Sequence, residues 1–297
     1  MVRSLLILAI GFSLMACRPA ASPQNQAPVA AREITDDLNH SVKLSAKIER
    51  AVSLAPNLTE IIFAVDGGRT LVGDTTYCDY PDAAKTIQKV GDTLNPNIET
   101  IIALKPQVVF VSTASQIESF SKALEAQDIA VFVTNSKDLE SVYRSIAQIG
   151  EILGTSEKAQ QVIEDMKRRA QTVESRTSQA REVKTFVQIS KEPLFTIGKD
   201  SFMTDLINRA GGVSVTANVP EGYPKFSKES ALALQPEAII ISDSPDNPAP
   251  NEVFKDSPAV KTGRVYKIKS DLLSRPGPRL VDGLEQIAKD LHPENFQ

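Results

Sequence analysis

The chain has 297 residues, which is enough to bury a substantial core, and the usual size of a protein domain favours two domains. Its 33 basic residues are mixed among 37 acidic ones and leave a formal net charge of -4, so no basic patch indicates a nucleic-acid partner. The two histidines, His40 and His292, are too few for a zinc or manganese site built from several converging ligands. Composition therefore predicts neither a nucleic-acid binder nor a metal receptor.

The first segment has the features of an export signal. Arg3 is followed by an apolar run that is too short to span a bilayer comfortably. The run ends at residues 14–17, Leu-Met-Ala-Cys, which resembles the lipobox of bacterial lipoproteins. We therefore expect a signal peptide over residues 1–16 and a mature protein that begins at lipidated Cys17 and is anchored to a membrane facing the periplasm or the cell exterior. An ordinary signal peptide with an incidental cysteine is the alternative.

Residues 17–32 are predicted to form a flexible tether. The stretch RPAASPQNQAPVAA is rich in Pro, Ala, Gln and Ser, and it has no apolar periodicity. Roughly fifteen such residues give a reach on the order of 20 Å. Cys78 has no partner left once Cys17 is acylated, so no disulfide is expected.

From residue 33 the pattern alternates between strands and helices, after a hairpin whose turn residues separate short extended flanks. Continuous apolar strands in such an alternation predict a parallel sheet covered on both faces. We assign residues 33–153 to an N-terminal α/β lobe. Its strands are expected at 51–54, near 71, at 108–112 and at 129–133, and its helices at 57–65, 97–104, 116–127 and 138–153.

A single long helix is predicted over residues 154–180. Gly154 closes the preceding helix, Thr155 or Ser156 can cap the next one, and no Gly or Pro interrupts the pattern until Pro193. About 24 residues at 1.5 Å each span roughly 36 Å, which is long for a helix inside one domain. We expect this helix to join two lobes.

Beyond the long helix the alternation restarts over residues 181–297. The predicted fold is therefore α/β, with two Rossmann-like lobes joined by one long helix, and a cleft between two such lobes is a favoured ligand site. Strands of the second lobe are expected at 185–190, 194–197, 238–242 and 264–269, and helices at 201–210, 227–234 and 278–291.

A repeat relates the two lobes. Residues 99–112, ETIIALKPQVVFVS, align at an offset of 130 with residues 229–242, ESALALQPEAIIIS. Each copy has the pattern of a helix that opens with a glutamate, stops at a proline and leads into a buried strand. The chain thus carries the same unit once in each half.

Three ordered runs, RAVSLAPNLTEIIFAV, VGDTTYCDYPDAAK and KVGDTLNPNIETIIALKPQVVFV, resemble the substrate-binding proteins of ABC importers that carry vitamin B12, iron-siderophores and haem. The resemblance is greatest to the B12-binding members and continues through FTIGKDS, GYPKFSKES and DLLSRPGPRL. It implies a monomeric, exported binding protein without catalytic activity or a cofactor of its own. Such a protein captures a corrinoid and delivers it to a permease dimer with its ATPase subunits.

The resemblance also implies a role for the repeated glutamates. In that family each lobe presents one glutamate on its outer rim, and the pair docks onto arginine pockets of the two permease subunits. Glu99 and Glu229 fall on those positions. Independently, Asn97 and Ser227 are expected N-caps, which place both glutamates in a first helical turn where negative charge contributes about 0.3–1 kcal/mol. A purely local helical role is the alternative.

Ligand contacts from both lobes are implied as well. Tyr77 matches a tyrosine that packs on the corrin face, and Phe195 and Tyr223 match aromatic positions of the second lobe. Core positions are the alternative for these aromatic residues, and a solvated surface loop is the alternative for the last segment. That segment matches a loop that contacts the ligand and consists of Asp271, Leu272, Leu273, Ser274 and Arg275.

The chain departs from the family in its cleft aromatics. It has no tryptophan, and Thr93 stands where the best-known B12 binders carry one. A ferric siderophore or haem is therefore the alternative ligand: haem calls for an axial ligand such as tyrosine, and an anionic siderophore calls for converging Arg and Lys, of which the cleft segments show only Arg275. A two-domain α/β enzyme is a distant alternative.

Overall fold

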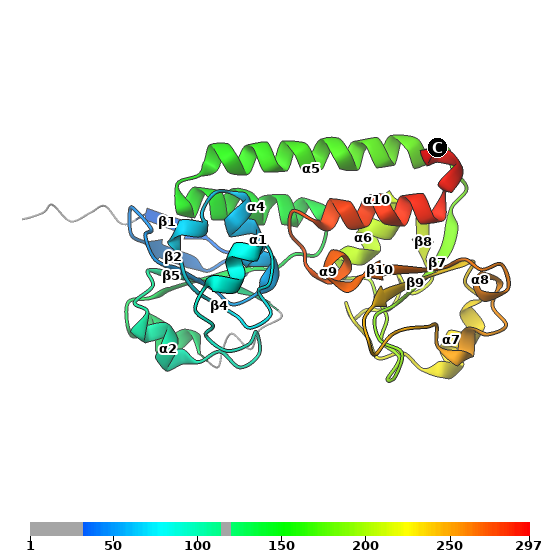
Figure 1. The fold of residues 1–297 in the computed structure, drawn as a ribbon, viewed down its shortest axis with the longest axis horizontal. Coiled ribbons are helices and arrows are strands. Elements are labelled where there is room, and N and C mark those ends of the chain that lie inside the picture. Colours follow the sequence, from blue (N-terminus) through cyan, green and yellow to red (C-terminus); the bar gives the residue numbers. More distant parts are fainter. Residues whose placement is uncertain (1–31, 114–119) are drawn as a thin grey trace, which may run out of the picture.

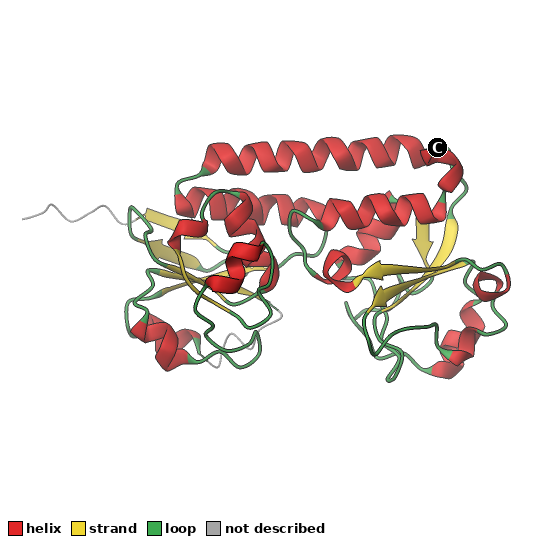
Figure 2. Cartoon of the chain, viewed as in Figure 1, coloured by secondary structure: helices red, strands yellow, loops and turns green. Residues whose placement is uncertain are grey.

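The computed structural model describes residues 32–113 and 120–297, and Figure 1 shows two α/β lobes side by side beneath a long helix. The signal segment, Cys17 and nearly all of the tether lie outside the described residues. Helices and strands alternate in both lobes (Figure 2), which confirms the predicted two-lobed α/β class. In the described part of the chain, no helix is both long and apolar enough to cross a membrane.

The N-terminal lobe is organised by a parallel sheet with the strand order β4-β3-β5-β6. An antiparallel hairpin of β1 (Arg32–Thr35) and β2 (Ser41–Leu44) precedes it, as the turn residues predict. The central strands are buried because apolar clusters cover both faces of the sheet. The sheet strands are β3 (Ala51–Ser53), β4 (Leu71–Asp74), β5 (Val108–Ser112) and β6 (Ala130–Thr134). The helices are α1 (Pro56–Ala64), α2 (Ile98–Ala103), α3 (Ser121–Glu125) and α4 (Leu139–Leu153).

The C-terminal lobe has the same plan, with the strand order β10-β9-β7-β8. In both lobes the first strand lies between the second and the third, and the fourth lies outside the third. The strands are β7 (Val183–Gln188), β8 (Gly212–Ser214), β9 (Ala238–Asp243) and β10 (Val265–Lys269). The helices are α6 (Phe202–Arg209), α7 (Lys228–Leu234), α8 (Pro258–Lys261), α9 (Ser270–Ser274) and α10 (Leu280–Leu291). Short 3-10 turns are η1 (Gly68–Thr70), η2 (Asp82–Thr86), η4 (Glu252–Phe254) and η5 (Pro293–Phe296).

The long helix α5 (Ser156–Thr177) has 22 residues and runs along both lobes, above α4 of the first lobe and α10 of the second (Figure 1). Arg169 fixes it to α10 through Asp282 at 2.6 Å and Glu285 at 2.8 Å. A single hydrophobic cluster also continues from the N-terminal lobe through α5 into the C-terminal lobe. The apolar stripe that α5 buries consists of Ala159, Ile163, Met166, Ala170 and Val173.

The sequence repeat is reproduced in the backbone. Helix α2 precedes β5 and helix α7 precedes β9, so each copy supplies the third strand of its sheet. A left-handed residue follows each helix directly before the repeated proline, Lys105 with φ 48° and Gln235 with φ 43°. The predicted N-caps are confirmed, because Asn97 and Ser227 each accept a hydrogen bond from the backbone N–H three residues later, at 2.9 and 3.0 Å.

A polar link between the lobes lies at the start of α4. Asp205 of α6 accepts a hydrogen bond from the backbone N–H of Leu139 at 3.0 Å, so the second lobe helps to cap a helix of the first. The helix also has its own capping box between Asp138 and Ser141. Arg209 holds the carboxylate of Asp205 at 2.9 Å. The lobes are thus joined by side-chain contacts as well as by α5.

Some local predictions are wrong. Residues 194–197 do not form a strand, because Phe195 makes only isolated bridges to neighbouring segments. Strand β8 is missed, since its three residues begin with the second glycine of a pair and carry too little periodicity to signal a strand. Residues 271–275 are predicted to be a loop, but all except the last belong to α9. The predicted helix 116–127 is observed only over α3, and its first part lies outside the described residues.

Candidate ligand-binding site

A cavity of about 520 Å³ lies between the two lobes. Its wall combines α1, the Tyr77 loop and the ends of β5 and β6 from the first lobe with α6, the Tyr223 loop and α9 from the second. We refer to this cavity as the cleft. It occurs where the predicted site lies, at the carboxyl ends of parallel strands, which is a favoured position for ligands in α/β proteins.

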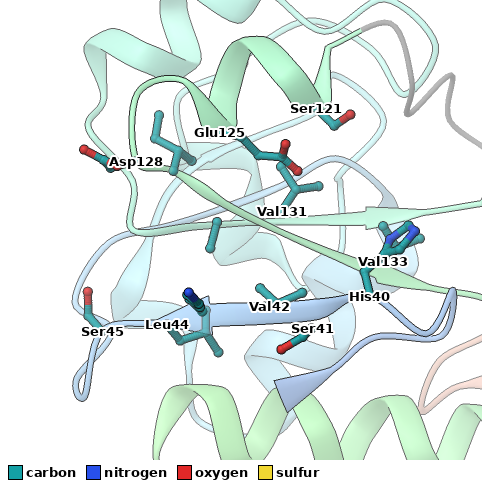
Figure 3. Close-up of a pocket in the computed structure, with 13 residues that line it drawn as sticks. His40, Ser41, Val42, Leu44, Ser45, Ser121, Glu125, Asp128, Val131 and Val133 are labelled. Atoms are coloured by element: carbon teal, nitrogen blue, oxygen red, sulfur yellow. The ribbon is translucent and has the colours of Figure 1, made fainter. Parts of the chain in front are cut away.

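A larger hollow of about 620 Å³ lies elsewhere, on the N-terminal lobe alone (Figure 3). Strand β2 with Val42 and Leu44 forms one side, and β6 with Val131 and Val133 forms the other. Among the described residues that line it, His40 carries the single aromatic ring and all belong to the N-terminal lobe. We therefore take the smaller cleft, with residues from both lobes, as the candidate site.

The repeated serines lie on opposite walls of the cleft. Ser112 ends β5 and Ser242 lies near the end of β9, and both line the cavity. Their hydroxyl groups can donate and accept hydrogen bonds. The sequence analysis missed them as site residues, although the repeat and the strand ends were the available signal.

One tyrosine from each lobe faces the cleft. Tyr77 is 61% exposed and Tyr223 is 47% exposed, so both rings are available to a ligand. Burial raises the pKa of Tyr223 to about 12, against a smaller lowering effect of its hydrogen bond with Ser201. The Tyr223 phenol therefore stays protonated at neutral pH. Thr93 also lines the cavity.

The third predicted aromatic, Phe195, does not line the cavity. The ring is half-buried, and the backbone of the residue bridges towards Lys225. Two residues at the start of α6, Phe202 and Met203, line the second lobe's side instead, and the Phe202 ring lies 6.4 Å from the Tyr223 ring. The sequence analysis assigned both to a helix but not to a site, because helical spacing alone does not distinguish a core face from a cleft face.

The segment 271–275 is split by its helical conformation. Asp271, Leu273, Ser274 and Arg275 line the cleft. Leu272 points elsewhere and packs against the core. The helix α9 therefore brings most of the predicted segment to the cavity and leaves one residue out.

A cluster of five charged side chains joins the lobes beside the cleft. We call it the interlobe cluster, and it consists of Glu60, Asp79, Asp271, Arg275 and Arg279. Glu60 is its centre. The side chain of Glu60 is only 2% exposed, and its carboxylate accepts hydrogen bonds from the guanidinium groups of Arg275 and Arg279. The guanidinium of Arg279 binds it with two nitrogens, Nε at 2.8 Å and Nη2 at 2.6 Å.

Arg275 is surrounded by acceptors. Its Nη1 donates to Glu60 at 3.0 Å and to Asp79 at 2.7 Å, and its Nη2 lies 2.9 Å from Asp271. The Arg275 side chain is 11% exposed. Partial burial pushes the pKa of Asp79 upward, but the hydrogen bond and the charge of Arg275 outweigh this and hold the pKa below its ordinary value of 3.8.

Arg279 also covers an aromatic ring. Its guanidinium lies 4.0 Å from the centre of the Tyr80 ring, a cation–π contact. The hydrogen bond with Glu60 is the main cause that raises the pKa of Arg279. Asn57 adds a hydrogen bond across the lobes to the carbonyl of Pro276 at 3.2 Å. The sequence analysis missed Glu60 and Arg279, and the only signal for Glu60 was a charge within the apolar helix of LTEIIFAV.

Neither of the two repeated glutamates, Glu99 and Glu229, lines the cleft. Figure 1 shows α2 and α7 on the edge opposite α5, one in each lobe. Glu99 and Glu229 occupy the first turns of these helices, and both are exposed. Among residues 32–113 and 120–297, neither carboxylate forms an ion pair. Their placement is the same in both lobes.

Cys78 is buried beneath the Tyr77 loop and is a free cysteine. Its sulfur lies 3.2 Å from the hydroxyl of Thr59 and 3.1 Å from that of Thr75. Burial raises the pKa of this thiol, so it stays protonated at neutral pH. In the described segments, no group of three or more His, Cys, Asp or Glu residues could hold a metal ion.

Comparison with known proteins identifies the family. Residues 52–272 match the family model described as periplasmic binding protein, and the chain belongs to this family. It is therefore an extracytoplasmic substrate-binding protein and not an enzyme, so the alternative of a two-domain enzyme is dropped.

Individual relatives and solved structures resemble the chain over most of its length. The chain is 33% identical, over 89% of its length and 86% of the relative, to an uncharacterized ABC transporter substrate-binding lipoprotein, YvrC, of Bacillus subtilis. A solved vitamin B12-binding protein of Vibrio cholerae superposes with a TM-score of 0.74 at 26% identity, covering 84% of this chain and 99% of that one. A haem-binding protein of Pseudomonas aeruginosa superposes with a TM-score of 0.73 at 25% identity, covering 83% and 93%.

Proposed function

We propose that the chain is the substrate-binding protein of an ABC importer and captures cobalamin or a related corrinoid in the cleft. The observation that carries the proposal is the placement of Tyr77 and Tyr223 on one cavity from opposite lobes, with polar strand ends around them. Aromatic faces suit a flat macrocycle, and hydroxyl groups suit its peripheral amides. The likeness to the Vibrio cholerae vitamin B12-binding protein supports the same ligand.

Each part of the cleft has a distinct task. Tyr77 stacks on the corrin ring from the first lobe, and Tyr223 contacts it from the second. The oxygens of Asp271 accept hydrogen bonds from the amide groups, while Ser274 and the Arg275 backbone complete that side. Phe195 and Leu272 lie outside the lining and are not assigned a contact with the ligand.

Haem or a ferric siderophore is the second candidate ligand, and the haem-binding relative of Pseudomonas aeruginosa supports it. Haem needs an axial ligand, and among the described residues that line the cleft Tyr77, Tyr223 and Met203 could supply one. A tyrosine ligates iron as the phenolate.

Delivery uses the outer edge of the molecule. Glu99 and Glu229 dock onto the two subunits of a permease dimer, whose ATPase subunits drive uptake. The support is their shared position in the first turns of α2 and α7 on one edge. A monomer with one glutamate in each lobe fits a two-fold partner.

The chain reaches its partner from a membrane anchor at Cys17, through the tether. Changing Cys17→Ala is expected to release the protein from the membrane fraction while leaving ligand binding intact. Mass spectrometry of the mature N-terminus checks the modification directly. A native protein that is wholly soluble with an unmodified N-terminus contradicts the anchor.

The ligand is tested by comparing the binding of the candidate ligands. The purified protein is incubated separately with cyanocobalamin, haemin and ferric siderophores, and the visible absorbance of the protein peak is read after gel filtration. Cyanocobalamin is expected to co-elute and to raise the melting temperature. Co-elution of haemin or a ferric siderophore, with no bound cyanocobalamin, transfers the assignment to the second candidate.

A further inference from the structure

We infer that Glu60 is a specificity residue: by occupying the guanidinium groups of Arg275 and Arg279, it makes the cleft select neutral, amide-rich ligands and reject anionic ones. The inference rests on the proposed function, since it names the chemical class of ligand for the same cleft. It is carried by the contacts and charges of the interlobe cluster.

The cluster has an excess of negative charge. Three carboxylates, those of Glu60, Asp79 and Asp271, surround two guanidinium groups, so the net charge is -1 when all are ionised. A guanidinium cannot lose its proton in a protein. Asp79 stays ionised at neutral pH because Arg275 lowers its pKa.

The part of the cleft that the structure describes therefore has no cation left for an anionic ligand. Among the described residues that line it, only Asp271 and Arg275 carry a charge. Arg275 already has carboxylate oxygens of three residues within 3.0 Å. A carboxylate, catecholate or propionate group in the cleft would lose its hydration without gaining a free cation.

Asp271 favours a neutral hydrogen-bond donor over an anionic group. Its side chain is partly exposed in the cleft, and its second carboxylate oxygen lies 4.0 Å from Arg279. Asp271 can therefore still accept hydrogen bonds from the N–H groups of an amide. A carboxylate in the place of that amide is repelled by Asp271 and offers no donor. Primary amides around a neutral macrocycle match this surface.

A matched pair of ligands tests the inference. Cyanocobalamin is compared with its monocarboxylic acids, in which one peripheral propionamide has been hydrolysed, by calorimetry with the full protein. The acid whose carboxylate faces the cluster is expected to bind about tenfold more weakly than cyanocobalamin, from one unscreened like-charge contact at a partly buried site. Haemin and its dimethyl ester form a second pair with the same logic.

Variants of the cluster test whether its charge causes the discrimination. Asp79→Asn removes a carboxylate that is half exposed, so folding is preserved, and it should reduce the discrimination to about threefold. Glu60→Gln with Asp79→Asn leaves the two guanidinium groups in excess and should abolish or invert the discrimination. Glu60→Asp retains the charge and should retain the discrimination. Glu252→Gln is a matched change at a residue that is 84% exposed and lies outside the cleft. It should leave the ratio of the affinities for cyanocobalamin and its acid unchanged.

The outcomes separate the inference from the proposed function. Equal binding of cyanocobalamin and all its acids to the native protein overturns the inference and leaves the corrinoid assignment intact. Binding of haemin but not of its ester, with no corrinoid bound, overturns both. Preference for the ester without corrinoid binding overturns the corrinoid assignment and supports the role of Glu60. A ratio that stays the same in the double variant, with its fold confirmed by melting, also overturns the inference.

Discussion

The two lobes share a scaffold but differ in what they bring to the cleft. Both sheets have the same strand order, and in both the repeat forms the third strand with the helix before it. The outer edge is therefore alike, with Glu99 and Glu229 in equivalent first turns. The inner wall is not: the first lobe supplies buried Glu60, and the second supplies Arg275 and Arg279. Under the proposed function, the repeated outer edge would face a two-fold permease and the unequal inner walls would face one ligand.

The largest expected effect comes from removing the carboxylate of Glu60 at the centre of the interlobe cluster. Glu60→Ala leaves two partly buried guanidinium groups without their shared acceptor, which should lower the free energy of unfolding by about 3 kcal/mol. Glu229→Ala, a matched change in an exposed first turn, should cost less than about 1 kcal/mol. Urea denaturation of both variants measures the difference. An equal loss of unfolding free energy in Glu60→Ala and Glu229→Ala would show that the interlobe cluster does not stabilise the fold.

The equivalent glutamates of the outer edge, Glu99 and Glu229, are tested by their effect on coupling to the transporter. Glu99→Ala with Glu229→Ala should leave the affinity for ligand unchanged, because both residues lie away from the cleft, and should reduce uptake or ATPase stimulation more than tenfold, on the order of 1.4 kcal/mol or more. Each single variant should show a partial loss of similar size, since the lobes are equivalent at this edge. Glu157→Ala, an exposed first-turn glutamate on α5, is the control. Full coupling in the double variant rejects the docking role.

The smallest expected effect is a pH dependence within the interlobe cluster. The pKa of Asp79 is lower in the folded protein than its ordinary value of 3.8, so its ion pair contributes stability above that value and loses it as the pH falls further. Because Asp79 is half exposed, the contribution is less than about 1 kcal/mol. Unfolding of the native protein and of Asp79→Asn between pH 3 and 6 checks this, and the difference between them should shrink towards the acid end. A difference that is constant over this range contradicts the ion pair.

The scaffold could be predicted from the sequence because its signals are local. The strand at 108–112 is observed with the predicted bounds, since a continuous apolar run bounded by a proline specifies a buried strand. Its counterpart in the repeat, β9, is observed one residue longer than predicted. The run at 194–197 has a similar apolar pattern but pairs only by isolated bridges, because tertiary context and not composition decides whether a segment joins a sheet.

The site could be predicted only in part. Tyr77, Tyr223, Asp271 and Arg275 line the cleft as the resemblance implies, and their role in binding stays a prediction. Glu60 was missed because its partner in the second lobe is 219 residues away along the chain, and no local pattern shows such a pairing. A charge within an apolar helical face indicates that a partner exists, but not where it lies.

The most direct test of the central claim, that one corrinoid is held between the two lobes, is a calorimetric titration with cyanocobalamin. The native protein, Tyr77→Ala, Tyr223→Ala and the double variant are compared, with melting curves to confirm that each is folded. One ligand per chain is expected, with each single change weakening binding by about 0.5–1.5 kcal/mol beyond the lost area and the double variant weakening it more than either. Binding that is unchanged in all three variants, or no binding to the native protein, would contradict the claim.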